Sequence, residues 1–69
     1  MKFNYSKLLG RIKECGYTQE KLAEEIQINK STLNQKLKNK SHFTTLELSK
    51  MCKTLSISPA EIGEYFFAE

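Results

Sequence analysis

The stretch that most constrains the fold runs from Thr18 to Lys40 and reads TQEKLAEEIQINKSTLNQKLKNK. In its first half, Leu22, Ala23 and Ile26 recur at the spacing that places side chains on one face of a helix. Thr18 has a hydroxyl that can cap this helix, which we expect to begin at the following glutamine. The first half of the stretch therefore predicts a short amphipathic helix.

The second half repeats this organisation after a short interruption. Ile28 is an apolar turn residue that can pack beneath both helices, and Asn29 is a suitable N-cap for a second helix. Leu33 and Leu37 are one helical turn apart and are expected to face the core. Two short helices joined by a tight turn are the outline of a helix-turn-helix, a motif that places its second helix in the major groove of DNA.

Charge is distributed unevenly along the chain, and this distribution favours contact with a polyanion. The net charge is +3 and the pI is near 9.0, which is a weak indication by itself. No Asp or Glu occurs between Ile26 and Leu46, and the lysines of that segment are Lys30, Lys36, Lys38 and Lys40. A basic helix face that also carries amides suits phosphates and base edges.

Side chains on the outer face of the second helix have chemistry suited to reading bases. Gln35 can pair bidentately with adenine, Lys30 can donate to guanine, and Ser31 can donate or accept. Lysines that lie off this face would contribute affinity and salt dependence instead. The predicted base-reading residues are Lys30, Ser31, Asn34 and Gln35.

The segments TQEKLAEEI and NKSTLNQKL, separated by an apolar turn residue, resemble the helix-turn-helix of the phage repressor and Cro family, the XRE-type regulators. The resemblance implies an all-α fold, a compact five-helix lambda-repressor-like domain over residues 1–69, with the motif at about 18–40 as helices 2 and 3. It also implies that Gln19 binds a DNA phosphate. With the lysines, the predicted phosphate contacts are Gln19, Asn29, Lys36, Lys38 and Lys40.

The sequence departs from the pattern of that family in three places. A glycine usually stands in the turn where this chain has Gln27, and another often follows the second helix where this chain has Asn39 and Lys40. Related repressors often bury an Arg–acid pair at the positions occupied here by Ile12 and Leu37. An apolar pair avoids the desolvation cost of a buried ion pair, so the last departure is compatible with the same fold.

Helices are also predicted on both sides of the motif. One runs from about Tyr5 to Cys15, after a lead-in at Met1 to Asn4, and ends at Gly16. Thr44 and Glu47 have the spacing of a capping box and open another helix. Its apolar stripe consists of Leu48, Met51, Cys52 and Leu55.

The fifth helix has the clearest start signal of the chain. Ser58 is an N-cap, Pro59 occupies the first position, and Glu61 stands three residues after the cap. The apolar residues that follow exceed what one narrow helix face can bury. Either the surplus forms a dimer contact, or one aromatic ring is partly exposed. The candidate dimer contacts are Tyr65, Phe66 and Phe67.

Several classes of protein are excluded by composition. Cys15 and Cys52 are far apart without a CxxC motif, both fall on apolar faces, and the chain has one histidine, so neither a metal site nor a disulfide framework is indicated. No set of catalytic residues and no phosphate-binding glycine loop is present, so we expect no enzyme, no cofactor and no small-molecule substrate. No signal peptide or membrane span is apparent, which predicts a cytoplasmic protein of a bacterial or phage-infected host, associated with the nucleoid.

Two functions are compatible with these patterns. The first is a sequence-specific DNA-binding transcriptional regulator, a phage-type repressor or Cro-like protein. It would bind a palindromic double-stranded operator as a homodimer, with half-sites about 34 Å apart. The alternative is a protein-interaction module, antirepressor or antitoxin-like, that uses the same fold and works through the aromatic residues of the fifth helix.

Overall fold

The computed structural model describes residues 2–69, and helices are the only regular secondary structure in that range. The predicted compact five-helix domain is confirmed. Met1, part of the predicted lead-in, lies outside the described residues. The helices are α1 (Ser6–Glu14), α2 (Gln19–Ile26), α3 (Lys30–Leu37), α4 (Thr45–Leu55) and α5 (Ile62–Phe66), with a 3₁₀ turn, η1 (Pro59–Glu61), directly before α5.

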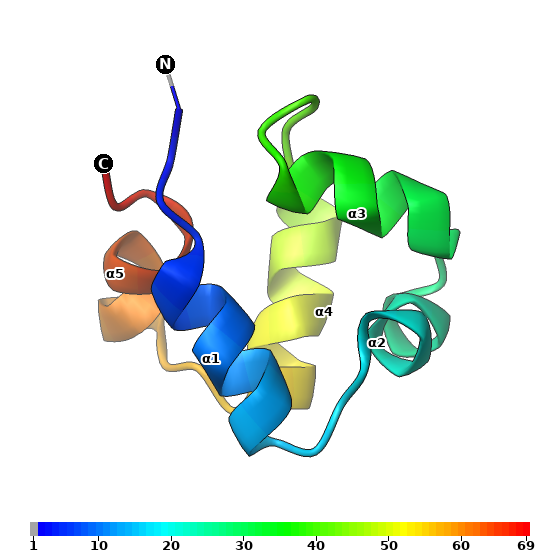
Figure 1. Ribbon diagram of the computed structural model, residues 1–69. Coiled ribbons are helices and arrows are strands. Elements are labelled where there is room, and N and C mark those ends of the chain that lie inside the picture. Colours follow the sequence, from blue (N-terminus) through cyan, green and yellow to red (C-terminus); the bar gives the residue numbers. More distant parts are fainter. Residues whose placement is uncertain (1) are drawn as a thin grey trace.

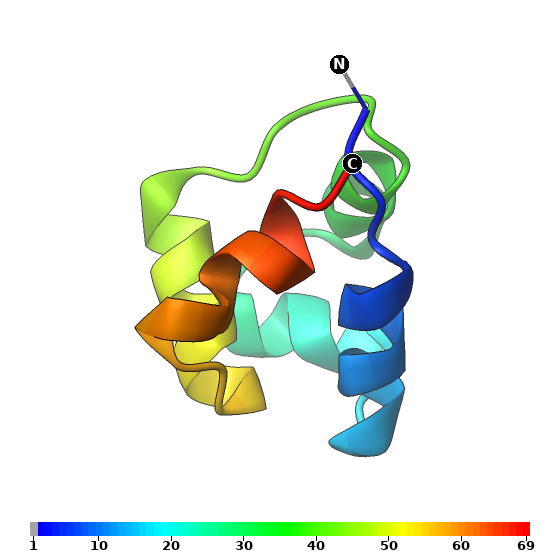
Figure 2. The same cartoon turned by 90° about the vertical axis from the view of Figure 1, so that its left-hand side faces the viewer.

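In the view of Figure 1, α4 lies near the centre, with α1 and α5 to its left, α2 to its right and α3 across its upper end. α2 packs against both α3 and α4, and α1 packs against α5. The two termini lie at the same end of the domain, next to the loop that follows α3 (Figure 2). Within the described range, no helix has the length and hydropathy required to cross a membrane.

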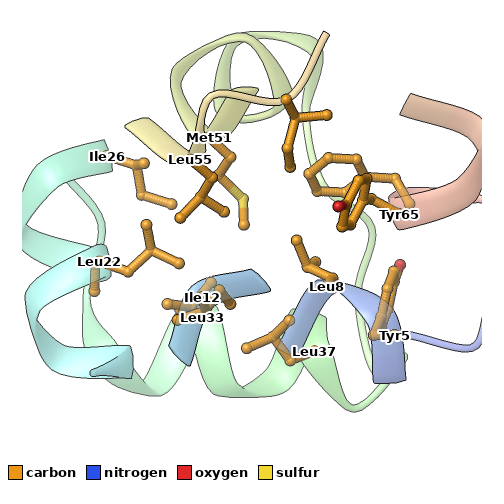
Figure 3. Close-up of a cluster of buried hydrophobic side chains, with 13 residues drawn as sticks. Tyr5, Leu8, Ile12, Leu22, Ile26, Leu33, Leu37, Met51, Leu55 and Tyr65 are labelled. Atoms are coloured by element: carbon orange, nitrogen blue, oxygen red, sulfur yellow. The ribbon is translucent and has the colours of Figure 1, made fainter. Parts of the chain in front are cut away.

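Each of the five α-helices contributes side chains to a single apolar core (Figure 3). Burial of one such side chain stabilises the fold by about 1.5–3 kcal/mol. Ile12 and Leu37, the apolar pair predicted at the positions of an ion pair in related repressors, both belong to this core. The most completely buried large side chains are Leu8, Leu22, Ile26, Leu33, Met51, Leu55 and Phe66.

The predicted N-caps of α2 and α4 are present as hydrogen bonds. The Thr18 hydroxyl accepts from the Lys21 N–H at 3.1 Å. Thr44 and Glu47 form the full capping box: the Glu47 N–H donates to the Thr44 hydroxyl at 3.1 Å, and the Thr44 N–H donates to the Glu47 carboxylate at 2.8 Å. Asn29 has the backbone conformation of an N-cap, but its side chain makes no capping hydrogen bond.

The start of the fifth helix differs from the prediction. Pro59 opens η1 rather than an α-helix, and the α-helix begins only at Ile62. The Ser58 N–H and hydroxyl both donate to one Glu61 carboxylate oxygen, at 3.2 Å and 3.0 Å. These hydrogen bonds lower the pKa of Glu61 from its ordinary value. The predicted cap pairing is therefore correct, but it closes a tighter turn than an α-helix.

The two positions that lack the expected glycines both adopt left-handed backbone. Gln27 has φ 63° and Asn39 has φ 63°. Asn39 offsets this by binding the N-terminal segment: its side-chain oxygen accepts from the Phe3 N–H at 2.8 Å, and its side-chain nitrogen donates to the Phe3 carbonyl at 2.9 Å. A glycine at position 39 would lose both bonds, which accounts for an asparagine at that position.

Gln27→Gly is expected to raise the free energy of unfolding by about 0.5–1 kcal/mol. Left-handed backbone costs a residue with a Cβ atom about 1–2 kcal/mol, and glycine removes that cost at the expense of a more flexible unfolded chain. The side chain contributes only one exposed hydrogen bond, in which its oxygen accepts from Lys50 Nζ at 2.8 Å. Urea unfolding measures the change. Gln27→Ala is the control, because it loses the bond and keeps the strain; equal stabilities of the two variants would contradict the explanation.

Candidate interaction surfaces

The segment from α2 to the loop after α3 presents most of the predicted DNA contacts to solvent. Asn29, Lys30, Ser31, Gln35, Lys38 and Lys40 are exposed, and Gln19 and Asn34 are half-buried. The Asn34 side-chain nitrogen donates to the Gln19 side-chain oxygen at 3.2 Å, which ties the start of α2 to the middle of α3. Lys30 lies 4.0 Å from the Glu20 carboxylate, an exposed pair whose net energy is close to zero.

Lys36 is the exception, and the predicted phosphate contact is wrong for this residue. Only 7% of Lys36 is exposed. Its ammonium donates to the Glu47 carboxylate at 2.6 Å and to the His42 carbonyl at 3.0 Å, and it lies 6.0 Å from the centre of the Phe43 ring. The position is three residues after Leu33, at the edge of the core-facing stripe of α3, and the ammonium is already paired inside the domain.

Glu47 is therefore shared between the α4 capping box and Lys36. Burial acts to raise the pKa of Glu47, but the hydrogen bonds from Lys36 and from the Thr44 N–H, with the Lys36 charge, outweigh it and leave the pKa below its ordinary value. Because α3 and α4 are both held by this carboxylate, it fixes the end of α3 relative to the core.

Acid is expected to weaken the fold through this group. A carboxyl whose pKa is lower in the folded chain stabilises the fold above its unfolded pKa, near 4.5, and this stabilisation is lost as the pH falls through the folded pKa. Unfolding by urea at a series of pH values should show stability falling below about pH 4.5. The same series on Glu47→Gln should be flatter, and parallel curves for the two proteins would exclude Glu47 as the cause.

A second region, which we call the aromatic end, lies where both termini meet the loop after α3 and includes both buried and exposed rings. It comprises Phe3, Tyr5, Phe43, Phe66 and Phe67. Ring centres lie 5.5 Å apart for Phe3 and Phe67, 5.8 Å for Tyr5 and Phe43, and 5.7 Å for Phe43 and Phe66, each pair edge to face. Such pairs contribute about 0.5–1.5 kcal/mol beyond the burial of area. Phe67 remains 50% exposed.

The structure corrects the predicted dimer contacts. Tyr65 and Phe66 are buried, with 8% and 1% of each exposed, and Phe67 alone of the three is open to solvent. α5 ends at Phe66 and directs its apolar residues inward against α1. Lys7 covers the Tyr65 ring at 4.9 Å and pairs with Glu64. The apparent apolar surplus is therefore a single half-exposed ring just beyond the helix.

A third feature, the α4 groove, is an apolar hollow of about 570 Å³ between α4 and the η1–α5 segment. It is lined by Thr45, Leu48, Ser49, Cys52, Lys53, Ser56, Ile57, Pro59 and Ile62. Leu48 also lines a much smaller hollow of about 40 Å³ in the aromatic end, so the two features adjoin. Sequence reasoning missed this groove because it assigned Leu48 and Cys52 wholly to the core.

The cysteines differ in environment. Cys52 is half-buried and burial raises the pKa of its thiol, whereas Cys15 is exposed, contrary to its predicted place in the core. Cys15 directly follows α1, so the helical spacing that placed it on the apolar face no longer applies. Within the described range, no cluster of three or more His, Cys, Asp or Glu side chains could hold a metal ion.

Comparison with known proteins changes the expected family. The family model described as "Protein of unknown function (DUF739)" matches residues 1–69. The solution structure of the modulator of repression (MOR) of the temperate bacteriophage TP901-1 from Lactococcus lactis is similar, with a TM-score of 0.81 and 34% sequence identity over 97% of this chain and 90% of that chain. No curated protein matches.

The predicted membership of the phage repressor and Cro (XRE-type) family is therefore wrong. The residues that suggested it are N-caps, apolar positions and a turn residue. These residues specify the geometry of two packed helices, and that geometry is compatible with more than one family.

Proposed function

We propose that this chain, which belongs to the DUF739 family of proteins of unknown function, is a small phage-type regulator that modulates repression by binding a repressor protein. The observation that carries the proposal is its similarity to the modulator of repression of phage TP901-1, which extends over nearly the whole of both chains. The function corresponds to the interaction module that the sequence allows as an alternative to a DNA reader.

The aromatic end is the surface that best fits a protein partner. Aromatic residues are enriched in interfaces because they bury large areas with little loss of conformational entropy. Phe67 is half-exposed yet held by its edge-to-face contact with Phe3. The backbone around it is also fixed: the Asn4 N–H donates to the Ala68 carbonyl, and Asn39 binds Phe3. A preorganised apolar ring of this kind loses little freedom on binding.

Phe67→Ser is expected to weaken binding to the repressor encoded in the same genome by about 30-fold or more, the effect of losing a contact worth at least 2 kcal/mol. Isothermal titration calorimetry measures the affinity. Leu9→Ser is the matched control, because Leu9 is an exposed apolar residue on α1. Binding that is unchanged by Phe67→Ser, or weakened equally by both variants, would remove the aromatic end as the contact surface.

DNA binding through α3 is a second candidate, and one observation favours it. The exposed face of α3 carries Lys30, Ser31 and Gln35 without an acidic residue, and Asn34 orients Gln19 at the start of α2. These groups have the chemistry of phosphate and base contacts. A homodimer on a palindromic site would be required, and Phe67 alone offers a small dimer contact. Selection from a random DNA pool distinguishes this candidate, since a sequence reader would enrich a palindrome.

A further inference from the structure

The α4 groove has a volume of about 570 Å³, against about 40 Å³ for the hollow in the aromatic end. One wall is the stripe of α4 that includes Leu48, Ser49 and Cys52, and the other is formed by Pro59 and Ile62. α4 has 11 residues and is about 16 Å long, so the groove has an elongated wall of about three helical turns. Grooves of this form accept the apolar face of an amphipathic helix, with anchors spaced by one turn.

Charge around the groove indicates what kind of helix would fit. Lys53 is the one charged residue among those that line the groove, and within residues 2–69 it makes no ion pair. Glu61 lies between Pro59 and Ile62 in sequence but does not line the groove, and one oxygen of its carboxylate accepts both hydrogen bonds from Ser58. An incoming helix with an acidic side chain at its edge would therefore meet an unpaired cation in the groove, and none of the residues that line the groove is acidic.

The apolar surface continues beyond the groove on both sides. Leu46, which is 65% exposed, lies three residues before Ser49 and seven before Lys53, on the same stripe of α4. On the other side, Leu48 joins the groove to the aromatic end. Leu48 thus borders both the groove and the hollow that Phe67 lines.

We propose that the α4 groove receives an amphipathic helix of the repressor, with two apolar side chains one turn apart over Leu48 and Cys52 and an acidic residue beside Lys53. This inference rests on the proposed function, because it takes the repressor as the partner. On this proposal the repressor contacts two adjoining regions: the aromatic end binds one part of the repressor, and the α4 groove binds one of its helices.

The thiol of Cys52 provides a direct test of occupancy. In a Cys15→Ser variant, Cys52 is the one remaining thiol, and a chromogenic disulfide reagent reports its rate of modification. With the full-length repressor at about ten times its Kd, we expect modification about tenfold slower, in proportion to the unbound fraction. The matched control is Cys52→Ser, in which the exposed Cys15, directly after α1, should react at the same rate with and without repressor.

Two further variants test the charge. Lys53→Glu is expected to weaken repressor binding by about three- to tenfold, and Lys13→Glu, an equal charge change on α1, should have a smaller effect. If the repressor binds while Cys52 stays fully reactive, the groove proposal is overturned and the proposed function stands. If the repressor does not bind at all, the proposed function fails and the groove proposal fails with it.

Discussion

Replacing Glu47 with alanine is expected to lower the free energy of unfolding by about 3–5 kcal/mol, because it leaves the Lys36 ammonium buried without its counter-charge. The carboxylate accepts from Lys36 Nζ at 2.6 Å and from the Thr44 N–H at 2.8 Å. One substitution therefore removes a buried ion pair and half of the α4 capping box. Urea unfolding followed by circular dichroism measures the loss.

A double variant separates the buried charge from the shape of the site. In Lys36→Met with Glu47→Gln, the glutamine can still accept from the Thr44 N–H, and methionine fills the space of the lysine stem without a charge. We expect its stability to lie within about 1 kcal/mol of the wild type. If the double variant is as unstable as Glu47→Ala, the unpaired lysine is not the cause of the loss.

Phe66→Ala is the second large expected effect, with a loss of about 3–5 kcal/mol in the free energy of unfolding. The Phe66 ring is 1% exposed and packs edge to face against Phe43, so its removal leaves a cavity in the core. Phe67→Ala, at the next position, should cost about 1 kcal/mol, since that ring is half-exposed and loses mainly its contact with Phe3. Similar losses for the two variants would contradict the assignment of Phe66 to the core and Phe67 to the surface.

The sequence predicted most of the fold because the decisive signals are local. The N-caps Thr18 and Thr44 act within three residues, and the spacing of Leu22 and Ile26 defines a helix face without reference to other elements. The predicted helices therefore agree with the helices of the structure to within a few residues. The exception is the segment after Ser58, where the same cap pairing closes a 3₁₀ turn before α5.

The interaction surfaces were less predictable because they depend on contacts between distant residues. Lys36 was predicted to contact a phosphate because its ion-pair partner is not apparent from the sequence. That partner, Glu47, lies 11 residues away on another helix. Tyr65 and Phe66 were predicted to be dimer contacts because the helical spacing does not specify how α5 is oriented against α1. The α4 groove arises from two elements that the sequence describes separately.

Direct binding to the repressor tests the central claim most directly. The chain should be titrated by calorimetry into the repressor encoded in the same genome, and in parallel against a random DNA pool at low and high salt. We expect the complex with the repressor to persist at high salt. We also expect high salt to abolish DNA retention and the pool to yield no enriched motif, because salt screens contacts with phosphates but not apolar contacts. The absence of a repressor complex, with a palindrome enriched from the pool, would contradict the proposal and identify the chain as a reader of DNA.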